Sequence, residues 1–120
     1  MLQHVTLELR REDWPAAKHF WSMVGFEQVD PPGPLGEQSA WVERDGTQIH
    51  LQWHDEPVVP PSGHSAVVVD DWDGIVARLR EEGFEVDERQ RAWGAARCFV
   101  NAPGGHTVEL MAAPPPPTRA

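Results

Sequence analysis

The sequence has a single cysteine, few basic residues and no long apolar run. Its one cysteine, Cys98, excludes an intramolecular disulfide and favours a reducing compartment. Ten lysine and arginine residues against 19 aspartate and glutamate residues give a formal charge of −9, which argues against nucleic acid or an anionic membrane as partner. No apolar run approaches the ~20 residues of a membrane span. No charged segment followed by an apolar one opens the chain, which argues against export. We therefore expect a cytoplasmic protein.

The chain is long enough for one compact domain, which we place at residues 1–112. Residues 113–120 contain four consecutive prolines, none of which has a backbone N–H to donate. Such a segment cannot form regular helix or sheet, so we expect a frayed, disordered tail.

One pattern occurs twice along the chain. Residues 3–27 and 63–85 both run through a histidine, a short apolar segment, Asp-Trp, ten further residues and Gly-Phe-Glu. A second match sets GTQIHL at 46–51 against GHTVEL at 105–110, so that His50 falls opposite Glu109. The matched positions keep offsets of 58 to 60 residues, which indicates an internal duplication. We expect module one at 1–53, a proline-rich linker at 54–62 and module two at 63–112.

Each module is predicted to fold as strand, helix and three further strands. The opening strands are apolar or alternate, and each is followed by a helical stripe of apolar residues. Asp13 and Asp71 are expected to cap the helix starts with their carboxylates, and Gly25 and Gly83 to end the helices. The predicted strands are 3–9, 26–30, 38–43 and 48–53, then 64–69, 84–88, 96–100 and 106–111.

Strand residues two apart share a face, so alternation shows which side chains lie together. The apolar phases of the strands match the apolar helix stripes, which predicts that the helices cover one side of the sheet. The opposite phases carry four residues that bind metals well: His4, His50, His64 and Glu109. These imidazoles and the carboxylate suit Zn, Ni, Fe, Mn or Co. The alternative is that this side of the sheet simply faces solvent.

Several neighbours of these four residues are candidates for chemistry on the same face. Glu8 is either a general base or an ordinary rim residue, and Thr6 beside it is a candidate for binding substrate. Gln48 and Gln52 flank His50, where they would orient ligands or hydrogen-bond substrate. Trp41 and Trp93 line the pocket, where Trp93 would bind substrate, or they pack in the core or lie at the exposed rim. The remaining histidines are interpreted as surface residues: His19, His54 and His106.

The chain resembles the vicinal oxygen chelate superfamily, which is also called the glyoxalase/bleomycin resistance/dioxygenase superfamily. The resemblance spans about residues 2–112 and rests on HVTLELR, KHFWSMVGFE, GHSAVVVDDWDGIVARLREEGFEV and NAPGGHTVEL. It implies an α+β fold in which two βαβββ modules form a curled mixed-sheet cup, with the helices on its outer face. It also implies one divalent metal ion at the four positions that the repeat selects.

The resemblance implies a role in proton transfer for the carboxylate Glu109 beside the metal, with Glu8 as a second candidate. His50 departs from the glutamate common at this position in glyoxalase I. A site of three neutral imidazoles and one carboxylate would leave a divalent ion with a local charge of about +1, which favours an anionic substrate or a bound hydroxide.

Two functions follow from the resemblance. One is a metal-dependent lyase, isomerase or dioxygenase whose small substrate is chelated through neighbouring oxygens. The other is a metal-free, bleomycin-resistance-like protein that sequesters an apolar or cationic compound, which six tryptophans and the acidic charge favour. A scaffold without ligand is a third possibility. Family members commonly form homodimers, and we expect one here.

Overall fold

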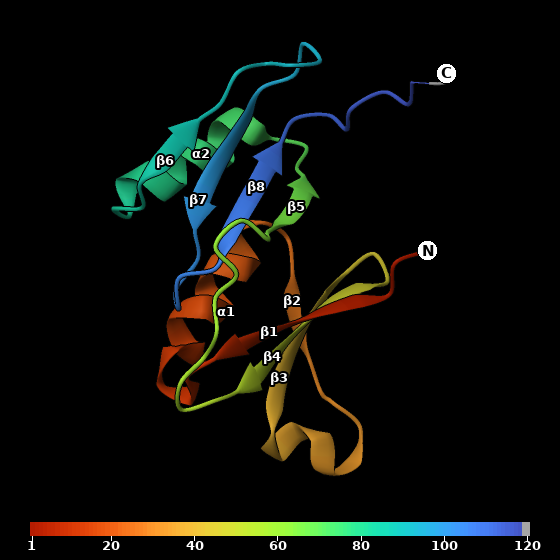
Figure 1. The fold of residues 1–120 in the computed structure, drawn as a ribbon, viewed down its shortest axis with the longest axis vertical. Coiled ribbons are helices and arrows are strands. Elements are labelled where there is room, and N and C mark those ends of the chain that lie inside the picture. Colours follow the sequence, from red (N-terminus) through yellow and green to blue (C-terminus); the bar gives the residue numbers. More distant parts are fainter. Residues whose placement is uncertain (119–120) are drawn as a thin grey trace. The chain divides into compact units, whose positions relative to one another are not determined.

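Two four-stranded mixed sheets, each with one long helix, make up the fold (Figure 1). The structure is a computed structural model that describes residues 1–118. The chain divides into a first unit, Met1–Pro61 with Ala102–His106, and a second unit, Ser62–Asn101 with the residues from Thr107 onward. The predicted α+β class with two βαβββ modules is confirmed.

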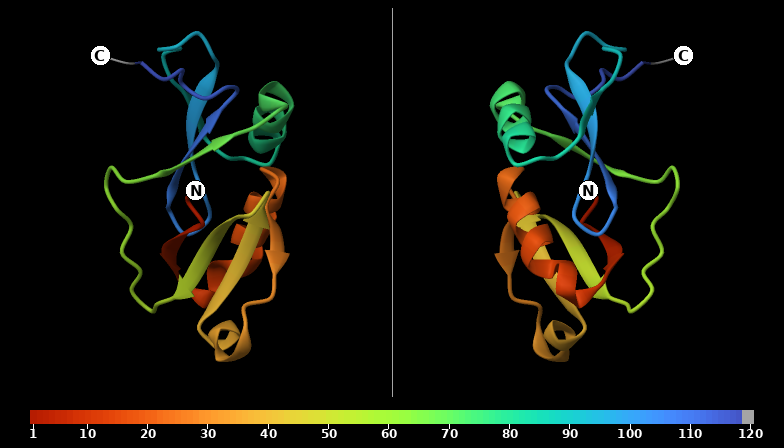
Figure 2. Two further views of the ribbon diagram at one scale, coloured as in Figure 1. Left: turned by 90° about the vertical axis from the view of Figure 1, so that its right-hand side faces the viewer. Right: turned by 90° about the vertical axis from the view of Figure 1, so that its left-hand side faces the viewer.

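The first unit holds its strands in the order β1-β4-β3-β2. β1 runs parallel to β4, and the other neighbouring pairs are antiparallel. Figure 2 shows α1 lying against one face of this sheet. The elements are β1 (His4–Leu9), the 3-10 helix η1 (Arg11–Asp13), α1 (Trp14–Met23), β2 (Glu27–Val29), the 3-10 helix η2 (Gly33–Glu37), β3 (Ser39–Arg44) and β4 (Thr47–Trp53).

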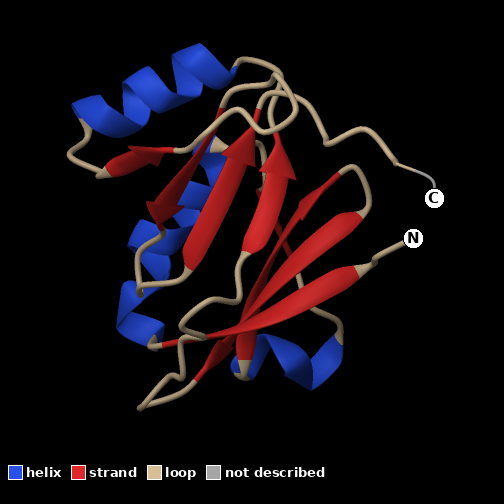
Figure 3. Ribbon diagram, turned by 45° about the horizontal axis from the view of Figure 1, so that its top comes forward, coloured by secondary structure: helices blue, strands red, loops and turns tan. Residues whose placement is uncertain are grey.

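The second unit repeats this arrangement with the strand order β5-β8-β7-β6 (Figure 3). β5 is parallel to β8, and the other pairs are again antiparallel. The common strand order is the result expected from a duplicated sequence. The elements are β5 (Ser65–Val68), α2 (Trp72–Glu81), β6 (Val86–Glu88), β7 (Arg97–Asn101) and β8 (Thr107–Met111).

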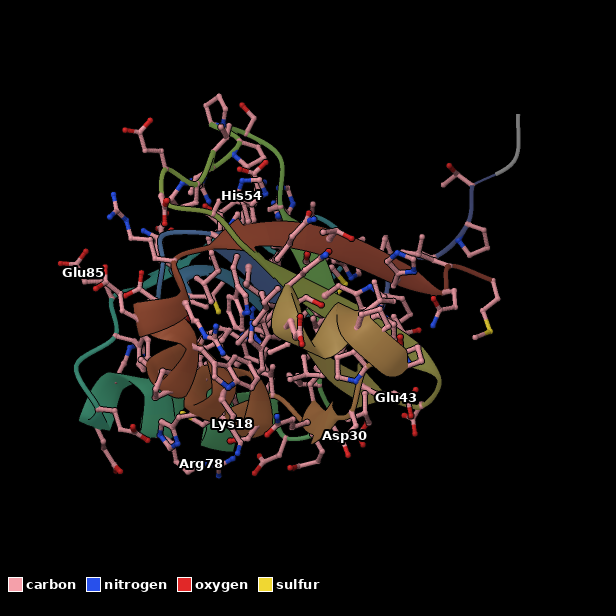
Figure 4. The ribbon with its side chains drawn as sticks, turned by 90° about the horizontal axis from the view of Figure 1, so that it is seen from below. Lys18, Asp30, Glu43, His54, Arg78 and Glu85 are labelled. Atoms are coloured by element: carbon pink, nitrogen blue, oxygen red, sulfur yellow. The ribbon has the colours of Figure 1, made fainter. Side chains whose placement is uncertain are left out.

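The core of each unit lies between its helix and the apolar phase of its sheet, as the alternation predicts. In the first unit Phe20 and Trp21 of α1 are buried, together with Val42 and Leu51 of the sheet. In the second unit the corresponding residues are Val76 and Leu79 with Val108 and Leu110. Each such side chain contributes roughly 2 kcal/mol when fully buried. The polar face of α1 points away from its sheet, where Lys18 is exposed (Figure 4).

The two helices begin differently. At α2 the Asp71 Oδ1 atom accepts a hydrogen bond from the Gly74 N–H at 3.1 Å, so the predicted cap is confirmed. At α1 the Asp13 carboxylate makes no capping bond, and that prediction is wrong. The reason is local, because η1 runs directly into α1 and leaves Asp13 with helical dihedrals (φ −84°, ψ −5°). A capping side chain normally needs an extended backbone at its own residue.

The two helices end in the same way, as predicted. Gly25 and Gly83 follow the last turns with φ of +96° and +90°, which only glycine adopts at little cost. In each case the glycine N–H and the next N–H return to carbonyl oxygens of the last turn, the pattern of a Schellman motif. The four bonds are Gly25 N to Ser22 O, Phe26 N to Trp21 O, Gly83 N to Arg80 O and Phe84 N to Leu79 O.

His106 is not the surface residue that the sequence suggests. It is 5% exposed, and its Nε2 atom lies 2.6 Å from the Glu8 carbonyl oxygen in the first unit. The turn that carries it, 102–106, packs so closely on Leu9 that a Cβ atom at Gly104 would clash. The local sequence indicates a turn, but it does not indicate that the distant strand β1 covers this turn.

The predicted tail is described only in part. Residues 114–118 form no helix or strand and are exposed, and residues 119–120 lie outside the described part. The start of the tail is tied down, because Trp93 donates its indole N–H to the Ala113 carbonyl oxygen at 2.9 Å. Within residues 1–118, neither helix combines the length and apolarity needed to cross a membrane.

Candidate functional site

Three aromatic rings stack on the polar face of the first unit. The His50 ring lies between Trp41, with ring centroids 3.7 Å apart and planes 3° apart, and His4, at 4.0 Å and 15°. Trp41 and His50 are direct partners across the antiparallel β3–β4 pair, and β1 lies on the other side of β4. The two neighbours leave His50 only 9% exposed. His4 and His50 therefore share one face, as the alternation predicts.

Hydrogen bonds hold two rings of this stack in place. The Trp41 indole N–H donates to Ser39 Oγ at 3.1 Å, and that hydroxyl donates to the Leu35 carbonyl oxygen at 2.8 Å. The His50 Nε2 atom lies 2.7 Å from Gln48 Oε1, and the Gln48 amide donates to Glu43 Oε1 at 2.8 Å. Ring orientation is thus set by contacts within the sheet and with η2.

Burial lowers the pKa of His50, and the nearby charge of His4 lowers it further. Two stacked imidazolium rings would repel one another, so the arrangement favours a neutral His50 at neutral pH. The neutral ring has a lone pair, which a metal ion or a hydrogen-bond donor needs.

A cavity of about 320 Å³ opens beside the stack. Thr6 and Gln52, both predicted to bind substrate, line it. The 3-10 helix η2 was not predicted, and it supplies part of the wall, including the 41% exposed side chain of Leu35. The full lining is His4, Thr6, Leu35, Gln38, Ser39, Trp41, His50 and Gln52.

The role of Trp41 could have been found in the sequence. Asp45 and Gly46 form the two-residue turn between β3 and β4, with φ of +50° and +86°. An Asp-Gly turn of this length fixes the register of a hairpin, and counting back from it pairs Trp41 with His50. No comparable signal marks η2.

A second polar cluster lies in the second unit around Glu109, which is 6% exposed on β8. Its Oε1 atom lies 3.1 Å from His64 Nε2, and its Oε2 atom accepts a hydrogen bond from Arg97 Nη1 at 3.2 Å. Arg97 also donates from Nε to the Gln90 carbonyl oxygen at 2.9 Å. Its guanidinium lies 5.2 Å from the Trp93 ring centroid. Arg97 was not predicted as a site residue, and no local pattern marks it.

His64 faces hydrogen-bond acceptors on both sides of its ring. Its Nδ1 atom lies 3.0 Å from the Ser62 carbonyl oxygen, which can only accept. A neutral ring that donates from Nδ1 must turn the lone pair of Nε2 toward the Glu109 carboxylate. Two acceptors at 3.1 Å need a proton or a cation between them.

Residues 2–110 match the sequence model of the Glyoxalase/Bleomycin resistance protein/Dioxygenase superfamily. The chain belongs to this superfamily. A comparison with curated proteins finds no match.

Several solved structures have the same fold. A glyoxalase family protein from Bacillus anthracis is similar with a TM-score of 0.80 at 22% identity, covering 92% of this chain and 93% of that one. The antibiotic binding protein TnmS3 from Streptomyces sp. CB03234 has a TM-score of 0.69 at 24% identity, covering 92% and 93%. A fosfomycin resistance protein from Listeria monocytogenes, solved with Mn(II) and a phosphonic acid, has a TM-score of 0.72 at 20% identity, covering 95% and 93%.

The residues predicted from the superfamily pattern lie in two pairs, His4 with His50 in the first unit and His64 with Glu109 in the second. Within residues 1–118, neither unit alone gathers three His, Cys, Asp or Glu side chains into a metal site. Each pair nevertheless fits a cation chemically. One contains a buried histidine whose pKa is lowered, and the other sets an imidazole nitrogen against a carboxylate oxygen.

Two further predicted site residues, Glu8 and Trp93, make contacts with the linker and the tail. Glu8 Oε1 accepts a hydrogen bond from the Val58 N–H at 3.0 Å and lies 3.7 Å from His54 Nδ1, so it holds part of the linker. Trp93 packs under Arg97 and bonds to Ala113. Their predicted roles, proton transfer for Glu8 and substrate binding for Trp93, stay predictions.

Proposed function

We propose that this chain is a divalent-metal-dependent enzyme of the superfamily, acting on a small substrate that binds through two neighbouring oxygens. His4, His50, His64 and Glu109 would hold one Zn, Ni, Fe, Mn or Co ion. The contact between His64 Nε2 and Glu109 Oε1 carries the proposal, because a buried carboxylate faces an imidazole nitrogen at 3.1 Å. The lowered pKa of His50 supports it, because metals bind the neutral ring.

The chain's own residues would divide the work. A bound divalent ion supplies a Lewis acid for oxyanion charge that develops on the substrate. Glu109 can accept a proton through Oε1 while Arg97 holds Oε2 in place. Thr6 and Gln52 line the cavity beside His4 and His50 in the first unit, where they can hydrogen-bond substrate oxygens. Trp41 offers an apolar wall that excludes water.

The charges of the site favour an anionic substrate. Three of the four proposed ligands are neutral imidazoles, and the charge of the fourth, Glu109, is already opposed by the guanidinium of Arg97. A divalent ion therefore keeps most of its positive charge for the substrate. Carboxylates, enediolates and phosphonates are the classes that such a site would prefer.

Metal content tests the proposal directly. Untagged protein should retain or take up about one equivalent of Zn, Ni, Fe, Mn or Co, measured by elemental analysis after dialysis. Glu109→Gln and His64→Gln should each weaken binding roughly tenfold or more. His19→Gln is the matched control, because His19 is an exposed histidine of α1 that lines a different cavity. Protein that binds none of these metals would refute the enzyme proposal.

A metal-free binding protein is the second candidate function. The 320 Å³ cavity with Trp41 and His50 in its wall favours it, as does the likeness to an antibiotic binding protein. Tryptophan fluorescence titrated with planar cationic compounds should then saturate in the presence of a metal chelator. Trp41→Leu should abolish that response. Binding that persists in chelator, without metal uptake, would select this function over the enzyme.

The superfamily resemblance also supports a homodimer as the working assembly, and the single cysteine supports a cytoplasmic location. Light scattering of the purified protein should give about twice the mass of one chain. A monomer that binds metal with full occupancy would show that one chain completes the site.

A further inference from the structure

Gln48 connects Glu43 to His50 along the polar face of the first unit. Glu43 and Gln48 are direct partners across the β3–β4 pair, and Gln48 and His50 are two residues apart on β4. The Gln48 amide donates to Glu43 Oε1 at 2.8 Å, and Gln48 Oε1 lies 2.7 Å from His50 Nε2. The three side chains form one continuous hydrogen-bonded row, the Glu43 row.

This row has a fixed direction. A carboxylate can only accept hydrogen bonds, so the end of Gln48 that faces Glu43 must be the NH₂ group. The carbonyl end of the same amide then faces His50, and it too can only accept. The ring nitrogen opposite it, Nε2, must therefore carry the proton.

We propose that Glu43 and Gln48 are positioning residues that hold His50 in the Nε2–H tautomer and leave Nδ1 as its only lone-pair nitrogen. An incoming metal ion or a donor group of a ligand must then approach His50 at Nδ1. The stacking of Trp41 and His4 on the two faces of the ring restricts a ring flip, which would put Cε1 in the place of Nε2 and break the contact with Gln48.

His4 has no such constraint, which makes it an internal comparison. Its Nδ1 atom lies 2.6 Å from Oε1 of the exposed Gln3 side chain. Within residues 1–118, no carboxylate holds the other end of the Gln3 amide, so that amide can turn and serve either tautomer. The two stacked histidines should therefore differ, with His50 fixed and His4 mixed.

The claim that a metal ion would bind His50 through Nδ1 rests on the proposed function. The tautomer itself is a property of the metal-free protein. It would hold equally if the cavity binds a small molecule without metal.

The experiment is long-range ¹H–¹⁵N NMR of metal-free protein with ¹⁵N-labelled histidine rings, at one neutral pH. Wild-type His50 should give the signature of the Nε2–H tautomer. Glu43→Gln frees the Gln48 amide to turn, and should lower the ratio of Nε2–H to Nδ1–H by roughly fivefold, as expected for one net hydrogen bond. Gln48→Lys, which presents only a donor, should invert the preference.

Two further variants guard against a general structural effect. The double variant Glu43→Gln with Gln48→Glu restores an acceptor toward His50 and should restore the Nε2–H tautomer. Glu27→Gln removes the carboxylate paired with Glu43 on β2, and should leave His50 unchanged. An Nδ1–H tautomer in the wild type, or a ratio that neither Glu43→Gln nor Gln48→Lys changes, would overturn the inference.

Addition of Zn²⁺ separates this inference from the proposed function. The Nδ1 resonance of His50 should shift on binding, while Nε2 keeps its proton. A shift at Nε2 with loss of that proton would refute the assigned donor nitrogen. Histidine spectra that do not respond to Zn²⁺ would count against the metal enzyme, while the tautomer measured without metal would still stand.

Discussion

Removal of the Arg97 guanidinium should destabilise the second unit through the buried carboxylate of Glu109. The Glu109 side chain is 8% exposed, and Arg97 Nη1 is its cationic partner at 3.2 Å. Arg97→Met keeps much of the aliphatic stem but leaves the carboxylate with His64 alone. Breaking a buried ion pair on one side costs more than removing both partners, because the remaining charge stays desolvated.

The size of the effect follows from the geometry. Two unit charges about 4 Å apart at an effective dielectric of about 20 attract by about 4 kcal/mol. Arg97 keeps 21% of its side chain exposed, and ordering it costs entropy, so we expect a net coupling of about 2 kcal/mol. The single change Arg97→Met should cost about 2 to 4 kcal/mol, and Glu109→Gln in that background should recover part of it.

The assay is a double-mutant cycle by urea denaturation, followed by tryptophan fluorescence. The pair Arg80–Glu88 provides a matched control, because its N–O distance is shorter, 2.9 Å, but both side chains are about half exposed. Its coupling should stay below about 1 kcal/mol. A coupling for Arg97–Glu109 no larger than that of the exposed pair would refute the view that burial gives this contact its strength.

Three other changes give clear expectations. Asp71→Ala removes the cap on the Gly74 N–H and should lower the free energy of unfolding by about 1 kcal/mol, measured by urea denaturation. Burial raises the pKa of the Cys98 thiol from 9.0 to about 11, so iodoacetamide should modify it only after unfolding. The same shift should cost roughly 3 kcal/mol of stability as the pH rises from 9 to 11, a loss that Cys98→Ala should not show. Burial, and to a smaller extent the charge of His4, lowers the pKa of His50 in the folded protein. The unfolded state therefore binds the proton more tightly, and the free energy of unfolding should fall as the pH drops below 6.5. His50→Gln should remove that part of the pH dependence, and an unchanged profile would contradict it.

Much of the fold was predictable because it depends on local chemistry. The ends of both helices follow from Gly25 and Gly83, whose positive φ needs no knowledge of the rest of the chain. The face of each strand follows from alternation, which correctly set Val108 and Leu110 in the core opposite Glu109. The predictions for Asp13 and His106 were wrong. The 3-10 helix η1 gives Asp13 helical dihedrals, and the distant strand β1 covers His106.

The candidate site, too, was predictable only where it depends on local sequence. The repeat and the strand parity alone selected His4, His50, His64 and Glu109, because a period of two is a property of the extended backbone. They could not select Arg97, the Glu43 row or the wall supplied by η2. Each of these depends on which residue lies opposite on a neighbouring strand, or on how a loop folds back. Strand register and side-chain rotamer are set by packing between segments far apart in sequence. Only the tertiary structure therefore decided which atoms of those four residues make hydrogen bonds or stack on other rings.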